Sequence, residues 1–188
     1  MTRYCSNLGP VKMSKSERNS AAAWKGMRVR VLFVCMGNLC RSPMAEGVFR
    51  QHVAQAGLDG HIAIDSAGTH DYHVGDAPDT RAQRAAGRRG YDLSALRGRQ
   101  VSRADFSEFD YVLAMDAANL RELERLCPPQ HAHKIKLFME FSAGAVLREV
   151  PDPYYGGEQG FEKVLDMVEE ASRGLLDHLR RRLETGAY

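Results

Sequence analysis

The chain has 188 residues, of which 44% are hydrophobic and 27% are charged, and its formal net charge is +2. These values are typical of a globular protein with one well-buried domain. The net charge is too small to indicate nucleic-acid binding, and no apolar run approaches the length needed to cross a membrane. We therefore expect neither a nucleic acid nor a membrane as a partner.

Residues 1–26 differ in composition from the rest of the chain. They hold Ser, Asn, Lys and Arg, with a short apolar patch only at 21–24. This stretch lacks the hydrophobic region of a secretory signal. We expect a disordered N-terminal extension, or an upstream start codon wrongly chosen, followed by one domain over 27–188.

The first predicted strand, over 29–35, leads directly into the most informative segment of the chain. Residues 35–42 read Cys-Met-Gly-Asn-Leu-Cys-Arg-Ser. A helix is predicted over 42–56, because Ser42 is a good N-cap and Pro43 fits the first helical position. One tight loop between a buried strand and a helix thus holds a thiol, an arginine and a hydroxyl.

This loop has the features of a phosphate-binding site. A helix N-terminus offers unpaired N–H groups, and a loop with inward-pointing N–H groups forms an anion nest. Gly37 and Asn38 tolerate the backbone angles that such a loop requires. The same positive field favours the thiolate of Cys35 over the thiol. Arg41 offers a planar fork for two phosphate oxygens, and Ser42 can donate a hydrogen bond to the sulfur.

The rest of the sequence alternates predicted strands and helices, which is the signature of a parallel α/β sheet. Further strands are predicted over 61–66, 110–115 and 135–138, and helices over 79–89, after the N-cap Ser102, over 117–126 and over 158–184. The last helix carries apolar side chains at helical spacing, which we interpret as core contact rather than a coiled coil. The active site is expected at the carboxyl ends of the strands.

A candidate general acid lies in the loop before the last helix. Residues 149–157 read Glu-Val-Pro-Asp-Pro-Tyr-Tyr-Gly-Gly, and the two prolines restrict the backbone around Asp152. Tyr154 and Tyr155 offer aromatic surface for a flat substrate. An aspartate between prolines is commonly a turn residue. Together with the phosphate-binding loop, however, Asp152 is predicted to protonate the leaving oxygen of a phosphate monoester.

Four segments, in this order, resemble the low molecular weight protein tyrosine phosphatase family; they are residues 31–46, 66–69, 109–116 and 152–156. The resemblance covers the chain from about residue 27 to its end. It implies a single α/β domain with a four-stranded parallel sheet flanked by helices and a phosphate-binding loop after the first strand. It also implies a phosphocysteine intermediate, with no metal and no other cofactor.

The resemblance implies roles for individual residues. Cys35 is the nucleophile, Arg41 the phosphate clamp and Asp152 the general acid. Ser66 supports the loop together with Asn38 and Ser42, and Cys40 forms a reversible disulfide with Cys35 under oxidation. The substrate-binding residues implied are Met36, Gly37, Asn38, Leu39, Cys40, Ser42, Tyr72, Tyr154 and Tyr155.

One position departs from the family pattern. Many members carry a histidine in the network around the loop asparagine, whereas Leu96 stands at that place here. The loop is therefore expected to be braced differently, and no residue is assigned to the histidine's role.

A loop of this kind also fits three other functions: arsenate reduction, phosphate transfer as a carrier, and phosphopeptide binding without catalysis. An arsenate reductase requires two further cysteines downstream, and only Cys127 is present. A phosphocarrier would have little use for Asp152, and a non-catalytic phosphopeptide-binding module would be expected to lose Cys35, Arg41 or Asp152. The sequence therefore favours a protein-tyrosine-phosphatase.

The cysteines also indicate a cellular setting. Cys5, Cys35, Cys40 and Cys127 show neither zinc-ligand clustering nor a disulfide framework. Because a reactive thiol requires a reducing compartment, a cytoplasmic location is expected. The expected substrates are phosphotyrosine proteins or small aryl phosphates, and the expected state is a monomer or weak dimer.

Overall fold

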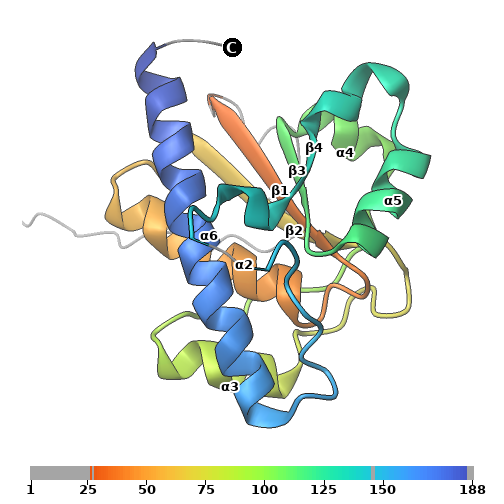
Figure 1. The fold of residues 1–188 in the computed structure, drawn as a ribbon, viewed down its shortest axis with the longest axis vertical. Helices are drawn as coiled ribbons and strands as arrows, with labels where there is room; N and C mark the ends of the chain where they lie inside the picture. Colours follow the sequence, from red (N-terminus) through yellow and green to blue (C-terminus); the bar gives the residue numbers. More distant parts are fainter. Residues whose placement is uncertain (1–25, 27, 145–146, 186–188) are drawn as a thin grey trace, which may run out of the picture.

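The computed structural model describes residues 26, 28–144 and 147–185. The extension predicted over 1–26 lies, except for Gly26, outside the described residues. Four strands form one parallel sheet in the order β2-β1-β3-β4. Their bounds are β1 Val29–Cys35, β2 Ile62–Gly68, β3 Tyr111–Ala114 and β4 Ile135–Leu137. The predicted single α/β domain with a four-stranded parallel sheet is confirmed (Figure 1).

Helices cover both faces of this sheet (Figure 1). Helices α2 and α6 pack against each other on one face, together with α3, while α5 packs on β3 and β4 at the other. The helical bounds are α2 Arg41–Gln55, α3 Thr80–Arg88, α4 Arg103–Glu108, α5 Ala117–Leu126 and α6 Gly157–Thr185, with short 3₁₀ turns η1 Pro129–Lys134 and η2 Phe138–Phe141. The two 3₁₀ turns were not predicted, because segments this short carry no periodic signal.

Strand β1 is buried on both faces apart from the partly exposed Arg30, and the predicted buried strand is confirmed. Alternate side chains point to opposite sides of the sheet. Phe33 enters the core under α2 and α6, where its ring meets those of Phe49 and Phe138 at centroid distances of 5.7 and 5.0 Å. Leu32 and Val34 enter the second core on the opposite face. The central strand is therefore rigidly held, and so is the loop that follows it.

The last helix contributes a buried stripe to the first core, which confirms its interpretation as core contact. The buried apolar side chains of the predicted stripe are Phe161, Val164, Leu165, Val168, Leu175, Leu176 and Leu179. Leu183, at the end of the stripe, is only partly buried.

The start of α2 differs from the prediction. The helix begins at Arg41 with Cys40 at the N-cap position, and the Cys40 side chain makes no capping hydrogen bond. Ser42 is thus inside the first turn instead of capping it, and Pro43 is the third helical residue. The Ser42 hydroxyl is engaged by the side chains of Cys35 and Asn38. The Cys40 side chain therefore leaves the first turn of α2 uncapped, and the N–H groups of an uncapped first turn can bind an anion.

The sheet order places the loop at a topological switch point. The chain leaves β1 through α2 to reach β2 on one side, and then crosses over to β3 on the other side. Connections that run in opposite directions leave a crevice at the carboxyl end of the central strand. Residues 36–40 lie at this end, and the segment before α6 reaches it through a hydrogen bond from the Val150 N–H to the Met115 carbonyl, 2.8 Å long.

Candidate active site

The loop after β1 is fixed by one asparagine in a left-handed conformation. Asn38 has a φ of 55°, a positive value shared with no other non-glycine residue in the described part of the chain. Its side chain is 2% exposed. The amide nitrogen donates to the hydroxyls of Ser42 and Ser66, both at 2.9 Å, and the amide oxygen accepts from the Arg99 N–H at 3.0 Å. The loop shape is thereby set by side-chain contacts.

The same network continues away from the loop without a histidine. The Ser66 hydroxyl donates to Glu46 at 2.5 Å, and Glu46, which is 1% exposed, is paired with Arg50 at 2.9 Å. Leu96, which the resemblance led us to expect at the position of a family histidine, is buried in the apolar core. The loop asparagine is thus braced by two serine hydroxyls and a backbone N–H, and the carboxylate behind Ser66 is neutralised by arginine.

Cys35 ends β1 at the floor of the site. It is 3% exposed, and its sulfur lies 3.0 Å from the Ser42 hydroxyl. Cys40 belongs to the same loop but has a different environment. Burial, with added repulsion from Asp79, raises the pKa of the Cys40 thiol to about 12. Cys40 is therefore a neutral thiol near pH 7, which leaves Cys35 as the candidate nucleophile of the loop.

Arg41 reaches from the first turn of α2 to the ends of two other segments. Its guanidinium pairs with Asp116 and with Asp152, the latter at 3.2 Å, and donates to the Val150 carbonyl at 3.2 Å. Burial alone would lower the pKa of Arg41, but the charge of Cys35 and the hydrogen bond to Asp116 outweigh it and raise that pKa. The guanidinium is therefore a fixed cation beside the sulfur.

Asp116 was not assigned a role from the sequence. It follows β3 directly and caps α5, where its carboxylate accepts from the Asn119 N–H at 2.7 Å. A carboxylate that is itself held by a helix N-terminus orients the arginine that it binds. The signal was available, because Asp116 stands at the carboxyl end of the strand next to β1, where side chains of neighbouring parallel strands converge.

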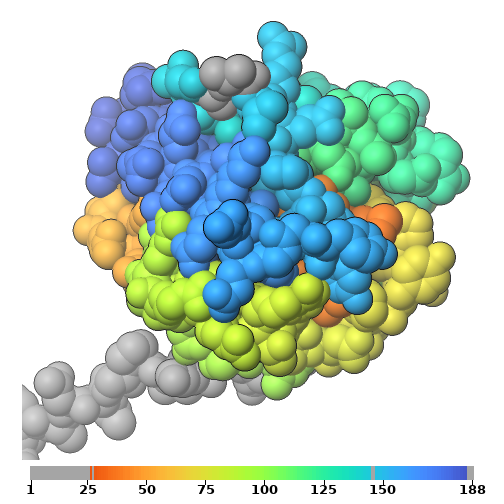
Figure 2. Space-filling view, turned by 60° about the horizontal axis from the view of Figure 1, so that its bottom comes forward, coloured from red at the N-terminus to blue at the C-terminus, as the bar shows by residue number. Residues whose placement is uncertain are grey.

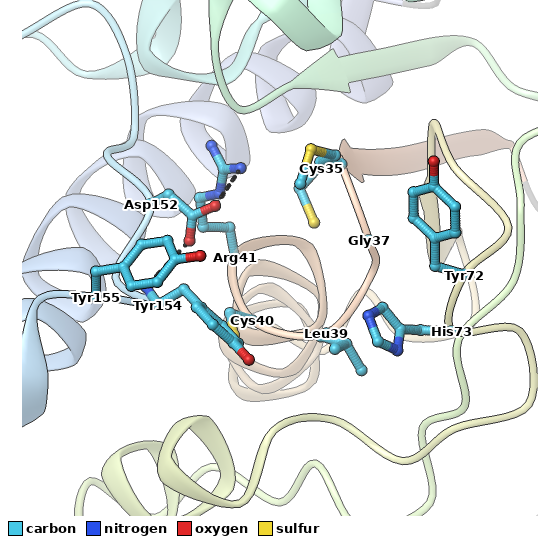
Figure 3. A pocket seen from close by; sticks show the side chains of 11 residues that line it. Cys35, Gly37, Leu39, Cys40, Arg41, Tyr72, His73, Asp152, Tyr154 and Tyr155 are labelled. Atoms are coloured by element: carbon cyan, nitrogen blue, oxygen red, sulfur yellow. Dashed lines mark hydrogen bonds and ion pairs between the residues drawn. The ribbon is translucent and has the colours of Figure 1, made fainter.

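Asp152 stands at the mouth of the site with its side chain 46% exposed. One carboxylate oxygen faces Arg41 and the other accepts from the Tyr154 N–H at 3.1 Å. The predicted acid and the predicted phosphate clamp are therefore in direct contact at one side of the pocket (Figure 3).

These residues line one cavity of about 290 Å³, at the lower end of small-molecule sites. Tyr72 and His73 stand at one side of it, and Tyr154 and Tyr155 at the other (Figure 3). The complete lining is Cys35, Met36, Gly37, Leu39, Cys40, Arg41, Tyr72, His73, Asp152, Tyr154 and Tyr155.

Most of the predicted site residues thus meet in this cavity. Asn38, Ser42 and Ser66 lie beneath it, in the hydrogen-bond network of the loop. His73 was missed, because nothing in the long loop after β2 distinguishes it from its neighbours. Among the described residues, no group of three or more His, Cys, Asp or Glu side chains is arranged to hold a metal ion. In the same residues, no helix combines the length and apolarity needed to cross a membrane.

Comparisons with known proteins agree with this geometry. The family model described as low molecular weight phosphotyrosine protein phosphatase matches residues 30–185. A putative low molecular weight protein-tyrosine-phosphatase of Synechocystis is 47% identical over 82% of this chain and 99% of its own. The low molecular weight protein-tyrosine-phosphatase of Streptomyces coelicolor is 48% identical over 84% of this chain and 98% of its own.

Solved structures share the fold as well. A protein tyrosine phosphatase from Entamoeba histolytica, crystallised with Hepes in its active site, aligns with a TM-score of 0.79 and 41% identity. The alignment covers 85% of this chain and 99% of that one. The chain therefore belongs to the low molecular weight phosphotyrosine protein phosphatase family.

Proposed function

We propose that this protein-tyrosine-phosphatase hydrolyses phosphotyrosine and aryl phosphate monoesters with Cys35 as nucleophile, Arg41 as phosphate clamp and Asp152 as general acid. One observation carries the assignment. A thiol with a serine hydroxyl at 3.0 Å, a buried guanidinium and a carboxylate line one small cavity at the first turn of a helix. These are the groups that phosphoryl transfer through sulfur requires.

In the first step the phosphate dianion enters the loop and its equatorial oxygens take hydrogen bonds from backbone N–H groups and from Arg41. The Cys35 thiolate attacks phosphorus in line with the ester oxygen. The S–P bond forms while the P–O bond to the aryl group breaks, and Asp152 gives its proton to the leaving phenolate oxygen. The Ser42 hydroxyl, 3.0 Å from the sulfur, stabilises the thiolate by donating to it.

In the second step Asp152, now a carboxylate, takes a proton from a water molecule that attacks the phosphocysteine. The new P–O bond forms as the S–P bond breaks, which releases inorganic phosphate and restores the Cys35 thiolate. Arg41 stabilises the equatorial oxygens in both steps. Asp116 keeps the guanidinium in place, because it binds Arg41 from the side of α5.

The walls of the cavity support an aromatic leaving group. Leu39 and Met36 give it an apolar lining, and Tyr154 and Tyr72 stand at its edges. Tyr155 is 94% exposed at the rim, where a side chain of a protein substrate would pass. Phosphotyrosine proteins and small aryl phosphates are the substrates we propose, and a reducing, cytoplasmic setting is consistent with a reaction that needs free thiols.

The alternatives receive less support. Arsenate reduction on this loop needs a relay of downstream thiols, whereas Cys127 is the only cysteine after the loop in the sequence. It is the C-cap residue of α5, donates to the Pro128 carbonyl and does not line the cavity. A module that only binds phosphopeptides would not need Asp152 facing Arg41.

Hydrolysis of aryl phosphates by three proteins tests the assignment. Wild type should turn over both p-nitrophenyl phosphate and phenyl phosphate, and Cys35→Ser should abolish both activities. Asp152→Ala should reduce kcat/KM far more for phenyl phosphate, whose leaving group needs the proton, than for p-nitrophenyl phosphate. Equal losses on the two substrates would remove Asp152 from the role of general acid, and activity of Cys35→Ser would remove Cys35 from that of nucleophile.

A further inference from the structure

We propose that Arg81 is a positioning residue for the general acid, because it ties the phosphate-binding loop to the backbone that orients Asp152. The inference rests on the function proposed above. Arg81 lies in the first turn of α3, outside the lining of the cavity. In Figure 2 the blue surface at the start of α6 lies directly against the yellow-green surface of α3, and Arg81 joins these two parts.

On one side Arg81 is anchored to the loop through Asp79. The guanidinium donates two hydrogen bonds to the Asp79 carboxylate, from Nε to Oδ1 at 3.0 Å and from Nη2 to Oδ2 at 2.7 Å, in the bidentate geometry that arginine favours. These hydrogen bonds lower the pKa of Asp79. The Asp79 N–H in turn donates to the Leu39 carbonyl at 2.9 Å. The arginine is therefore fixed relative to the loop that holds the phosphate.

On the other side Arg81 holds the segment that bears the acid. Its Nη1 donates to the Tyr154 carbonyl at 2.9 Å, and the guanidinium carbon lies 4.9 Å from the centre of the Tyr154 ring and 5.1 Å from that of Phe161. Tyr154 is the residue whose N–H binds Asp152 at 3.1 Å. Both backbone polar groups of Tyr154 are thus used, one toward Arg81 and one toward the acid.

This link matters when substrate is bound. Without substrate, Asp152 is held by Arg41 at 3.2 Å and by the Tyr154 N–H. A bound phosphate takes over the guanidinium of Arg41, and a protonated acid no longer forms an ion pair with it. The orientation of Asp152 then depends on its hydrogen bond from the Tyr154 N–H. Because a small misplacement of a catalytic group is costly in rate, a loose Tyr154 should weaken proton donation.

The experiment compares Arg81→Ala with wild type, using kcat/KM for phenyl phosphate and for p-nitrophenyl phosphate. The loss on phenyl phosphate should exceed that on p-nitrophenyl phosphate roughly tenfold, a part of the 10²–10⁴-fold that general acid catalysis contributes. Arg81→Lys should be intermediate, because an ammonium can reach one partner but cannot bridge two as a fork does. Arg84→Ala, three residues further along α3 at an exposed position, is the matched control and should behave as wild type.

A double variant separates positioning from general damage. In the Asp152→Ala background, Arg81→Ala should cause no further selective loss on phenyl phosphate, since the group through which Arg81 acts is already absent. Equal losses on both substrates, or a selective loss that persists without Asp152, would overturn the inference. If Arg81→Ala does not fold, Arg81→Lys carries the same comparison. If wild type is inactive, or Asp152→Ala shows no substrate selectivity, the proposed function fails and the inference fails with it. If both behave as proposed and Arg81→Ala is not selective, the inference alone fails.

Discussion

Replacement of Asn38 by alanine should disturb both the stability of the protein and the shape of its phosphate-binding loop. Two effects add. Alanine in a left-handed conformation costs about 1 kcal/mol, and the Asn38 φ of 55° requires that conformation. In addition, the partly buried Arg99 N–H loses its acceptor, and an unsatisfied donor costs about 1–3 kcal/mol.

The serine hydroxyls limit the damage, because each keeps another partner. Ser42 still has the Cys35 sulfur, and Ser66 still has Glu46. The expected loss in the free energy of unfolding is therefore roughly 2–4 kcal/mol, measured by urea denaturation. The kcat/KM for p-nitrophenyl phosphate should fall about a hundredfold, since a displacement near 1 Å in a positioned site has that effect.

Asn38→Gly separates the two contributions. Glycine adopts the left-handed conformation without strain, so this variant loses the hydrogen bonds alone. It should be more stable than Asn38→Ala by roughly 1 kcal/mol while remaining less active than wild type. If Asn38→Ala unfolds at the same urea concentration as wild type and keeps its kcat/KM, the reasoning about this residue is refuted.

Four further outcomes are expected. Arg41→Lys should severely reduce kcat/KM, because an ammonium cannot bind two phosphate oxygens as a fork; near-normal activity would contradict the clamp. Asp116→Asn should leave the protein folded, as judged by thermal denaturation, but weaken inhibition by inorganic phosphate, since Arg41 loses one of its two ion pairs; unchanged inhibition would argue against this orienting role. Because the pKa of Cys40 is raised to about 12, alkylation near pH 7 should modify Cys35 and spare Cys40. Separately, peptide mass spectrometry after mild peroxide treatment should detect a Cys35–Cys40 disulfide. Preferential alkylation of Cys40, or no such disulfide, would count against these expectations.

The sequence predicted those parts of the molecule whose signals are local. The apolar run of β1 predicted a buried strand, and the spacing of apolar residues after 158 predicted the core-facing side of α6. The cysteine and arginine of the loop lie six positions apart, so their meeting around an anion follows from short-range geometry. Even here the capping position was wrong, because the hydroxyl of Ser42 is used by the sulfur and Asn38 instead of by the helix end.

The contacts that brace the site could not be predicted in the same way, because they join residues that are far apart in sequence. Asp116 is 75 positions from Arg41, and Tyr154 is 73 positions from Arg81. From Leu96 we expected that the loop is held by other residues than in much of the family, but the sequence did not identify those residues. The residues that hold the loop are the backbone N–H of Arg99, 61 positions from Asn38, and Glu46, which is reached through Ser66, 20 positions further along the chain.

Direct capture of the covalent intermediate is the most direct test of the proposed mechanism. Wild-type protein mixed rapidly with p-nitrophenyl phosphate and quenched in acid should yield a phosphorylated peptide containing residues 35–41. Fragmentation should place the phosphoryl group on Cys35, and Cys35→Ser should give no such peptide. Turnover of substrate with no adduct at any quench time, or with the phosphoryl group on another residue, would contradict the account.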